Sequence, residues 1–331
     1  MSDKLKIGLI GLGTAGLRHA KAIGKSAEGL VVAAADPSGS TKSLAKEHGF
    51  AWFSEYEAML NQVDMDAVII SVPHVFLPAT AIAAARHGKH ILLEKPMATT
   101  TAEADKIVQT CRTAGVRLMV NFVHRFRPEY QKAWELIQAG VIGRPVMAID
   151  TMSTGLREMP KWVWDEQISG GGMMMYGGVH SVDRLTWLMG SPVTDVGAEM
   201  GTFSYPVEVE DNLAGTLSFK NGSIGVVIHH RSTAKRTLGG WHTLVYGTRG
   251  AMKLVSGKEL IVESENETVR VPGEPEDRFL GAFQEFSNSI LSDRDPVPSG
   301  EDGLHVLDVT LSLYASVHTK SRVHISTNDT E

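Results

Sequence analysis

Cysteine is almost absent from this sequence: Cys111 is the one cysteine among 331 residues. A single thiol cannot form an intrachain disulfide, which excludes the disulfide-rich secreted domains and fits a reducing compartment. We interpret Cys111 as a small buried side chain in a helix. Long apolar runs are also lacking, since no stretch approaches the roughly 20 residues that span a bilayer. At the start, Asp3 and early lysines give no signal-peptide pattern. These absences predict a cytoplasmic protein with no membrane partner.

Positive charge is in deficit. The 32 lysines and arginines are outnumbered by 38 acidic residues, which gives a net charge of −6 and argues against nucleic acid as the main partner. The composition, 43% hydrophobic and 21% charged, is that of a soluble globular protein. The length exceeds that of one typical core and predicts two domains. Internal repeats and low-complexity linkers are lacking as well.

What is present in the first third is an alternation of strands and helices. Apolar segments at 5–10, 30–36, 67–72, 90–93 and 117–120 are predicted strands, and 77–89 and 101–115 are predicted helices. Strand and helix repeated in this way predict a doubly wound parallel sheet covered on both faces, the α/β Rossmann arrangement.

A glycine pattern follows the first predicted strand. Gly11, Gly13 and Gly16 spell G-x-G-x-x-G and lead into a helix, and Asp36 ends the second strand 20 residues beyond Gly16. The first glycine allows a tight turn, the second lets the backbone approach a pyrophosphate, and the third lets the helix pack on the strand. This context predicts a dinucleotide site at a helix N-terminus. Two further cofactor residues are predicted where the helix opens, Thr14 and Ala15.

Asp36 also bears on the choice of cofactor. A carboxylate at this place accepts hydrogen bonds from the adenosine ribose and repels a 2′-phosphate. The following PSGSTK contains no arginine, although Lys42 could reach the site. The sequence therefore favours NAD over NADP.

The stretch HILLEKPMATT places polar residues at the carboxyl end of the predicted strand at 90–93, where doubly wound sheets bind ligands. Lys95 can hold a ribose hydroxyl and a substrate hydroxyl, and its charge favours an alkoxide-like state. The alternative is a strand-end turn with a solvated ion pair. The remaining cofactor contacts predicted at strand ends are Ser71, Pro73, His74, Glu94 and Asn121.

The second domain shows a different pattern. Predicted strands at 146–152, 194–203, 212–219, 223–230 and 242–246 alternate polar and apolar residues, which favours a large, mainly antiparallel sheet. Asn221-Gly222 marks a hairpin turn. Helices are predicted at 128–138, 277–291 and 301–320.

The run GGGMMMYGGVHSVD, from Gly170 to Asp183, is the most unusual stretch. Tyr176, His180 and Asp183 are spaced to share one face of a helix. Gly177 and Gly178 remove side chains from that helix, and we expect the nicotinamide and the substrate to approach it there. The methionines between the glycines are interpreted as adaptable packing.

These motifs resemble the glucose-fructose oxidoreductase/inositol dehydrogenase/rhizopine-catabolism (Gfo/Idh/MocA) family of oxidoreductases. The resemblance covers nearly the whole chain and is carried by the dinucleotide fold, HGKHILLEKP, IGRP at 142–145, the G-G-G…G-x-H-x-x-D pattern, EDNLAGTLSFKNGSIG and YGTRGAMKL. It implies an NAD(P)-binding Rossmann domain over 1–125 and a substrate-binding and oligomerisation domain over 126–331. It leaves open that the C-terminal helix packs back on the first domain.

The resemblance implies a chemistry as well. It implies hydride transfer between NAD(P) and a secondary alcohol or ketone of a sugar, sugar derivative or cyclitol, in a homodimer or homotetramer. The imidazole of His180 aligns with the family histidine that exchanges a proton with the substrate hydroxyl, a task that suits its ordinary pKa of about 6.5. It also implies that the Lys95–Pro96 bond is cis.

Tyr176 departs from the family, which usually has aspartate at that place. Three interpretations follow, in order of preference. Tyr176 hydrogen-bonds a substrate hydroxyl while His180 is the base, or Tyr176 itself exchanges the proton with Lys95 lowering its pKa, or catalysis has been lost. Losing the aspartate removes a carboxylate that would keep the histidine charged, so we expect His180 to be neutral and able to act as base.

Other departures concern the substrate side. His74 takes a place where the family often has asparagine, and His124 one where it often has arginine. Trp162 and Trp164 are predicted to stack on sugar faces, with Trp162 also near the cofactor, although both could equally be core residues. Asp183 either touches substrate or pairs with Arg125 or Arg184. His229 and His230 do not make a metal site with His180, because neighbours on a strand point to opposite faces.

The leading functional hypothesis is thus an NAD-dependent sugar or cyclitol dehydrogenase. The alternatives are a keto-sugar reductase working in the reverse direction and a non-catalytic NAD-sensing regulator of the same fold.

Overall fold

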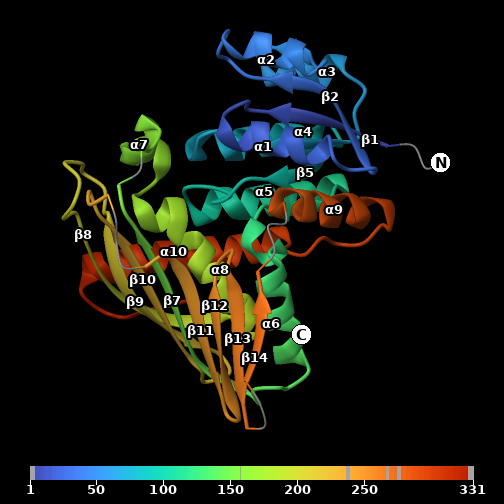
Figure 1. The fold of residues 1–331 in the computed structure, drawn as a ribbon. Helices are drawn as coiled ribbons and strands as arrows, with labels where there is room; N and C mark the ends of the chain where they lie inside the picture. Colours follow the sequence, from blue (N-terminus) through green and yellow to red (C-terminus); the bar gives the residue numbers. More distant parts are fainter. Residues whose placement is uncertain (1–3, 157, 236–238, 266–267, 274–276, 327–331) are drawn as a thin grey trace. The chain divides into compact units, whose positions relative to one another are not determined.

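The computed structural model describes residues 4–156, 158–235, 239–265, 268–273 and 277–326 (Figure 1). The chain forms two compact units. The first comprises 1–123 together with 277–304, and the second 124–276 together with 305–331. None of the helices in the described ranges combines the length and the hydrophobicity of a membrane span.

The first unit is built on a six-stranded sheet whose parallel arrangement confirms the prediction, although its short strand at 51–53 was not predicted. Its strands are β1 (Leu5–Ile10), β2 (Gly29–Ala35), β3 (Ala51–Phe53), β4 (Ala67–Ile70), β5 (His90–Leu93) and β6 (Leu118–Val120). They lie in the order β3-β2-β1-β4-β5-β6, so the chain order reverses beside β1. Ligands of such sheets bind at this reversal, outside the carboxyl ends of the strands.

Helices connect these strands: α1 (Thr14–Ile23), α2 (Thr41–Glu47), α3 (Tyr56–Gln62), the short η1 (His74–Phe76), α4 (Leu77–Arg86) and α5 (Thr101–Ala114). The ends of α5 show how the sequence sets them. Thr100 accepts a hydrogen bond from the Glu103 amide at the start, and Gly115 adopts a left-handed conformation (φ +67°) at the end. A side-chain cap and a terminal glycine satisfy amides and carbonyls that the helix cannot pair internally.

A late segment also belongs to the first unit. Helix α9 (Arg278–Leu291) buries Phe279, Phe283 and Phe286 and packs against α1. The ring of Phe283 lies so close to Gly29 of β2 that a Cβ there would be 2.3 Å from it. The sequence predicts this helix but contains no local signal for the strand it covers.

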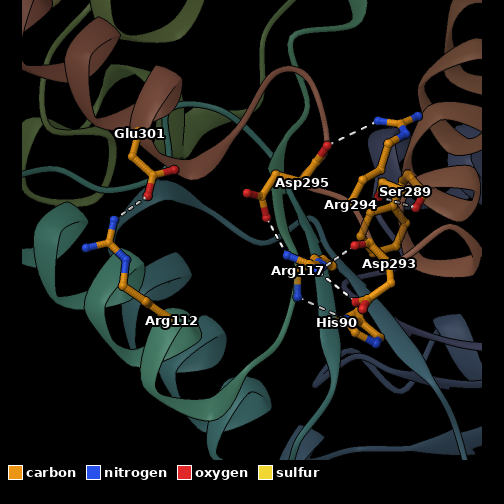
Figure 2. A network of polar contacts seen from close by, with 9 residues as sticks. His90, Arg112, Arg117, Ser289, Asp293, Arg294, Asp295 and Glu301 are labelled. Carbon is orange, nitrogen blue, oxygen red and sulfur yellow. Dashed lines mark hydrogen bonds and ion pairs between the residues drawn. The ribbon is translucent and has the colours of Figure 1, made fainter. Parts of the chain in front are cut away.

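Figure 2 shows how the turn after α9 is tied to β6 and α5. The Arg117 guanidinium reaches Asp293 at 2.7 Å and Asp295 at 2.5 Å, and Arg112 pairs with Glu301 at 2.9 Å. The carboxylates are largely exposed, so each pair contributes at most about 1 kcal/mol. The main effect of these ion pairs is to hold the turn against β6 and α5, since their contribution to the free energy of folding is small.

The second unit is built on a nine-stranded sheet, ordered β14-β13-β12-β11-β7-β10-β9-β8-β15. Its strands are β7 (Pro145–Thr154), β8 (Val193–Gly201), β9 (Asn212–Phe219), β10 (Ile224–Arg231), β11 (Trp241–Gly247), β12 (Gly250–Val255), β13 (Glu259–Ser264), β14 (Thr268–Pro272) and β15 (Val323–His324). Among the described strands of this sheet, only β7 and β10 pair in parallel; the other neighbours are antiparallel. The hairpin at Asn221-Gly222 forms as predicted, with Gly222 at φ +82°.

Helices cover one face of this sheet. Helix α8 (Val179–Met189) packs on β7 and β10, and α6 (Pro128–Gln138) on β12 and β13. Leu313 of α10 (Gly300–Thr319) lies over Gly215 of β9. The residues of β10 alternate accordingly: Val227 and His229 are buried, while Ile224 and Ile228 on the other face are 51% and 37% exposed.

Candidate active site

The turn between β1 and α1 has the geometry that the glycine pattern predicts. Gly11 has φ +93°, and a Cβ there would be 2.4 Å from the Ser71 carbonyl oxygen. A Cβ at Gly16 would be 2.0 Å from the Gly11 carbonyl oxygen, so this glycine lets α1 pack on the turn. Gly13 has nothing within 4 Å of its Cβ position. The open space is therefore at the glycine expected beside a pyrophosphate.

The surroundings of this turn suit an anionic group. Thr14 begins α1 and is exposed, Ala15 is half-buried, and the first turn of the helix contains no acidic residue. Asp36 accepts hydrogen bonds from the Leu12 amide at 2.7 Å and the Ser38 amide at 2.9 Å, which fixes its carboxylate at the end of β2 beside the glycine turn. Open backbone, the positive end of a helix and an acid for the ribose fit a dinucleotide.

The end of β4 closes the other side of the turn. The Ser71 hydroxyl donates to the Gly11 carbonyl at 3.0 Å, so this predicted cofactor residue also holds the turn together. Pro73 is half-buried and precedes η1, which His74 opens as a buried side chain.

The E-K-P stretch follows β5, and its glutamate is held by two side chains from other elements. Glu94 accepts hydrogen bonds from Nε2 of His19 on α1 at 3.0 Å and from Nδ2 of Asn121 after β6 at 2.6 Å. Burial alone would raise the pKa of Glu94, but the hydrogen bond and charge of His19 and the neighbouring Lys95 lower it overall. Glu94 is thus held as a carboxylate beside Lys95.

Sequence reasoning missed His19, although it follows Gly16 by three residues, one turn along the helix that the glycines begin. Its side chain is fully buried, with the ring edge against Phe279 of α9 at 4.9 Å between centroids.

Lys95 follows Glu94 at the carboxyl end of the sheet. Burial lowers the pKa of its ammonium and the charge of Arg278 lowers it further, while Glu94 opposes both. The Lys95–Pro96 peptide is cis, as the resemblance implies.

In the second unit, a buried carboxylate organises the glycine run. Glu210 accepts hydrogen bonds from the amides of Gly172 at 2.8 Å and Met174 at 2.7 Å, and Tyr314 of α10 donates to it at 2.8 Å. A Cβ at Gly172 would be 2.0 Å from the Glu210 carbonyl oxygen. The glycines therefore allow the chain to pass close to Glu210, which was not among the predicted residues.

Gly177 and Gly178 serve a different purpose from the one expected. They lie in a π-helical segment, η4 (Met174–Gly178), that runs directly into α8. A Cβ at Gly178 would be 2.1 Å from the Met174 sulfur, and one at Gly177 would be 3.1 Å from the Met152 methyl. Methionine side chains fill the space beside both glycines, so the prediction that a ligand approaches there was wrong. The predicted packing role of the methionines is confirmed, because Met173, Met174 and Met175 are buried.

Aromatic rings surround this helix start. The Tyr176 phenol is half-buried and meets Trp162 edge-on, with 6.1 Å between ring centroids. Trp164 stacks on Tyr205 at 5.1 Å, and the Arg231 guanidinium lies over both rings. The two indoles are therefore in different settings: Trp162 beside Tyr176, and Trp164 in a separate aromatic stack.

His180 stands in the first turn of α8 and stacks on His124, with 4.5 Å between centroids and 24° between planes. Trp241 of β11 adjoins both rings, at 4.5 Å from His124 and 6.1 Å from His180. The structure thus brings together two predicted substrate residues, His124 and His180, with an indole that sequence reasoning did not select.

Buried ion pairs lie beneath the imidazoles. Arg125 donates from Nε and Nη2 to one oxygen of Asp183, at 2.9 and 2.6 Å. Of the two interpretations of Asp183, the pairing with Arg125 is the one observed, and its contact with substrate stays a prediction. Arg184 pairs with Asp150 of β7, both fully buried.

His229 and His230 occupy opposite faces of β10. His229 is buried and hydrogen-bonds the Ser181 hydroxyl at 2.8 Å, whereas His230 is exposed. Among the residues that the structure describes, no group of three or more histidine, cysteine or acidic side chains is arranged to hold a metal ion.

A parallel sheet with a glycine turn at its reversal, an acid after β2 and a lysine after β5 define an NAD-binding oxidoreductase domain. Residues 5–122 match the family model described as "Oxidoreductase family, NAD-binding Rossmann fold", and residues 130–253 match the GFO/IDH/MocA C-terminal domain. The chain therefore belongs to the Gfo/Idh/MocA family of oxidoreductases.

Similar proteins span nearly the whole chain. An uncharacterized oxidoreductase, YrbE, of Bacillus subtilis is 27% identical over 320 residues, which cover 92% of each chain. The scyllo-inositol 2-dehydrogenase (NAD(+)) of the same organism is 26% identical over 330 residues, 94% of each. Among solved structures, a levoglucosan dehydrogenase in complex with NADH and levoglucosan has the same fold, with a TM-score of 0.89, 23% identity, and 98% and 100% of the two chains covered.

Proposed function

We propose that the protein is an NAD-dependent dehydrogenase that acts on a secondary alcohol of a sugar, sugar derivative or cyclitol. The observation that carries the proposal is the setting of Lys95, a half-buried lysine at the carboxyl end of β5, in the same sheet as the β1–α1 dinucleotide turn. Relatives named for inositol and anhydrosugar chemistry support the substrate class.

Two side chains carry the proton and charge chemistry in this proposal. NAD, when bound at the glycine turn, supplies the hydride acceptor. His180 takes the proton of the substrate hydroxyl, and Lys95 stabilises the negative charge that develops on the oxygen. Glu94 favours the charged form of Lys95, since its carboxylate opposes the lowering of the lysine pKa by burial. The same groups serve the reverse reaction, in which His180 returns the proton and a keto-sugar is reduced.

Tyr176 is assigned to binding. Its phenol lies beside Trp162, and the pair offers a hydroxyl to hydrogen-bond a substrate and an indole face to pack against a sugar ring. The open face of the nine-stranded sheet carries Ile224, Ile228 and Tyr246 as exposed apolar residues. We assign this face to the interface of a homodimer or homotetramer.

The test is a substrate screen followed by matched variants. Monosaccharides, anhydrosugars, glycosides and inositols are each incubated with NAD or NADP, and absorbance of the reduced nicotinamide is followed. We expect turnover of at least one polyol with NAD. Lys95→Met and His180→Ala should each lower kcat by about 10²- to 10⁴-fold, whereas Tyr176→Phe should mainly raise KM.

The variants also separate the alternatives. If Tyr176→Phe abolishes turnover while His180→Ala leaves most of it, the tyrosine and histidine roles are exchanged. A protein that binds NADH tightly but turns over none of these compounds in either direction would be a sensing regulator, and the dehydrogenase proposal would be wrong.

A further inference from the structure

Arg184 joins the buried ion pairs to the stacked imidazoles. Its Nε and Nη2 donate to the two carboxylate oxygens of Asp150 at 2.9 and 2.6 Å, and its Nη1 lies 2.7 Å from Nδ1 of His124. A guanidinium has donors only. Nδ1 of His124 must therefore accept this hydrogen bond, and the single ring proton of His124 is on Nε2.

Two arginine–aspartate ion pairs lie beside His124. Among the described residues of the second unit, the titratable groups that face His124 or these ion pairs include Arg184, Asp183 and His180 on α8, Arg125 beside it in the chain, Asp150 on β7, Tyr130 on α6 and His229 on β10. The two arginines match the two aspartates.

The neutral forms of His229 and Tyr130 are favoured by burial. Burial lowers the pKa of His229 to about 4, and burial raises that of Tyr130. A proton on Nδ1 of His124 would place a second positive charge directly facing the Arg184 guanidinium, which is unfavourable in a buried site.

The charge of His124 affects the stability of a proton on His180, whose ring stacks on it. At 4.5 Å between centroids, two imidazolium rings would repel each other, whereas a neutral ring attracts a cation over its face. We propose that Arg184, held in place by Asp150, is a positioning residue that keeps His124 neutral, so that His180 is the one imidazole of the stacked pair that takes up a proton.

This assignment deepens the proposed function and rests on it for the role of His180. When His180 accepts the substrate proton, the new imidazolium faces a neutral ring. Arg184 and Asp150 contribute by setting the charge of His124. The sequence offers the two residues no motif, since they stand 34 positions apart on different elements.

The first experiment uses unliganded protein, labelled with ¹⁵N in its histidine rings, so that it does not depend on turnover. Spectra recorded from about pH 5 to 8 report which ring nitrogen carries a proton, and His124→Phe identifies the His124 signals among those of 13 histidines. We expect Nδ1 of His124 to be unprotonated and Nε2 protonated throughout. A wild-type His124 that titrates to imidazolium in this range, or that carries its proton on Nδ1, would overturn the proposal.

The second experiment removes both charges together, because Arg184→Gln alone would leave Asp150 buried and unpaired. In the Asp150→Asn/Arg184→Gln double variant, the amide can turn its oxygen toward Nδ1, and His124 should now titrate. Arg184→Lys retains a group that can only donate and should restore the wild-type spectrum. Unchanged His124 spectra in the folded double variant would contradict the proposal.

Activity provides the independent readout. In the double variant, a charged His124 should lower the pKa of His180, so the acid limb of kcat/KM moves down by about one pH unit or more. His124→Phe keeps a neutral ring and should leave the position of that limb unchanged, whatever its effect on kcat. If no polyol is turned over, the proposed function fails while the spectra still decide the state of His124.

Discussion

Replacing His229 with asparagine tests the cost of burying a neutral histidine under α8. His229 is 2% exposed and hydrogen-bonds Ser181, and burial lowers its pKa from 6.5 to about 4. The asparagine amide can still hydrogen-bond the serine but has no proton to gain. On acidification, the free energy of unfolding should therefore fall more in the wild-type protein than in the His229→Asn variant.

The sign and size follow from the two pKa values. Between about pH 4 and 6.5, the unfolded chain binds a proton at this position that the folded chain does not, so the free energy of unfolding falls as the pH falls. The stabilisation is complete above pH 6.5 and is lost as the pH approaches the folded value of about 4. A gap of about 2.5 units corresponds to about 3 kcal/mol.

Urea unfolding followed by tryptophan fluorescence suits this measurement, because the second unit, which contains His229, holds all the tryptophans except Trp52. The quantity compared is the unfolding free energy of wild type minus that of His229→Asn, measured from about pH 7 to 4.5, so that other titrating groups cancel. His230→Asn, on the exposed face of the same strand, is the matched control and should follow wild type. A difference that stays constant with pH would refute the argument, because His229 would then gain its proton equally in both states.

Two further predictions concern the dinucleotide turn. Gly13→Ala adds a Cβ where no atom lies within 4 Å. It should change the free energy of unfolding by no more than about 0.5 kcal/mol, measured as a shift in melting temperature, but should weaken NADH binding, followed by fluorescence. Gly16→Ala, whose Cβ would be 2.0 Å from the Gly11 carbonyl oxygen, should instead cost about 1–3 kcal/mol of stability. Equal loss of stability in both variants would contradict the distinct roles of the two glycines. Asp36→Ser should raise the ratio of kcat/KM for NADP to that for NAD by about tenfold or more, equivalent to about 1.4 kcal/mol, and an unchanged ratio would show that Asp36 does not choose the cofactor.

Much of the fold could be predicted because its signals are local. The apolar run of β1, the glycines after it and the Asn221-Gly222 turn each determine structure within a few residues. The placement of α9 could not be predicted in this way. Its burial against α1 and β2 depends on contacts such as Phe283 with Gly29, more than 250 residues apart in the chain.

The candidate site also contains residues with local sequence signals and residues without them. Glycines and strand ends are local signals of the cofactor side, so Gly11, Asp36 and Lys95 could be predicted as site residues from the sequence. His19, Glu210 and Arg184 were not, because each acts on a residue from a distant segment: Glu94, Gly172 and His124 respectively. A buried polar residue needs a partner, but the sequence alone does not say which one.

In the glycine run, residue spacing predicts where a close approach occurs but not which group makes the contact. Because Gly177 and Gly178 have no Cβ, the sequence correctly predicts that another group packs closely against the helix there. The neighbour proves to be Met174, whose sulfur would lie 2.1 Å from a Cβ at Gly178, with the Met152 methyl beside Gly177. The π-helical segment places that methionine against its own helix. Its consequence for function is indirect: the glycines and methionines fix the start of α8, and with it the position at which His180 stacks on His124.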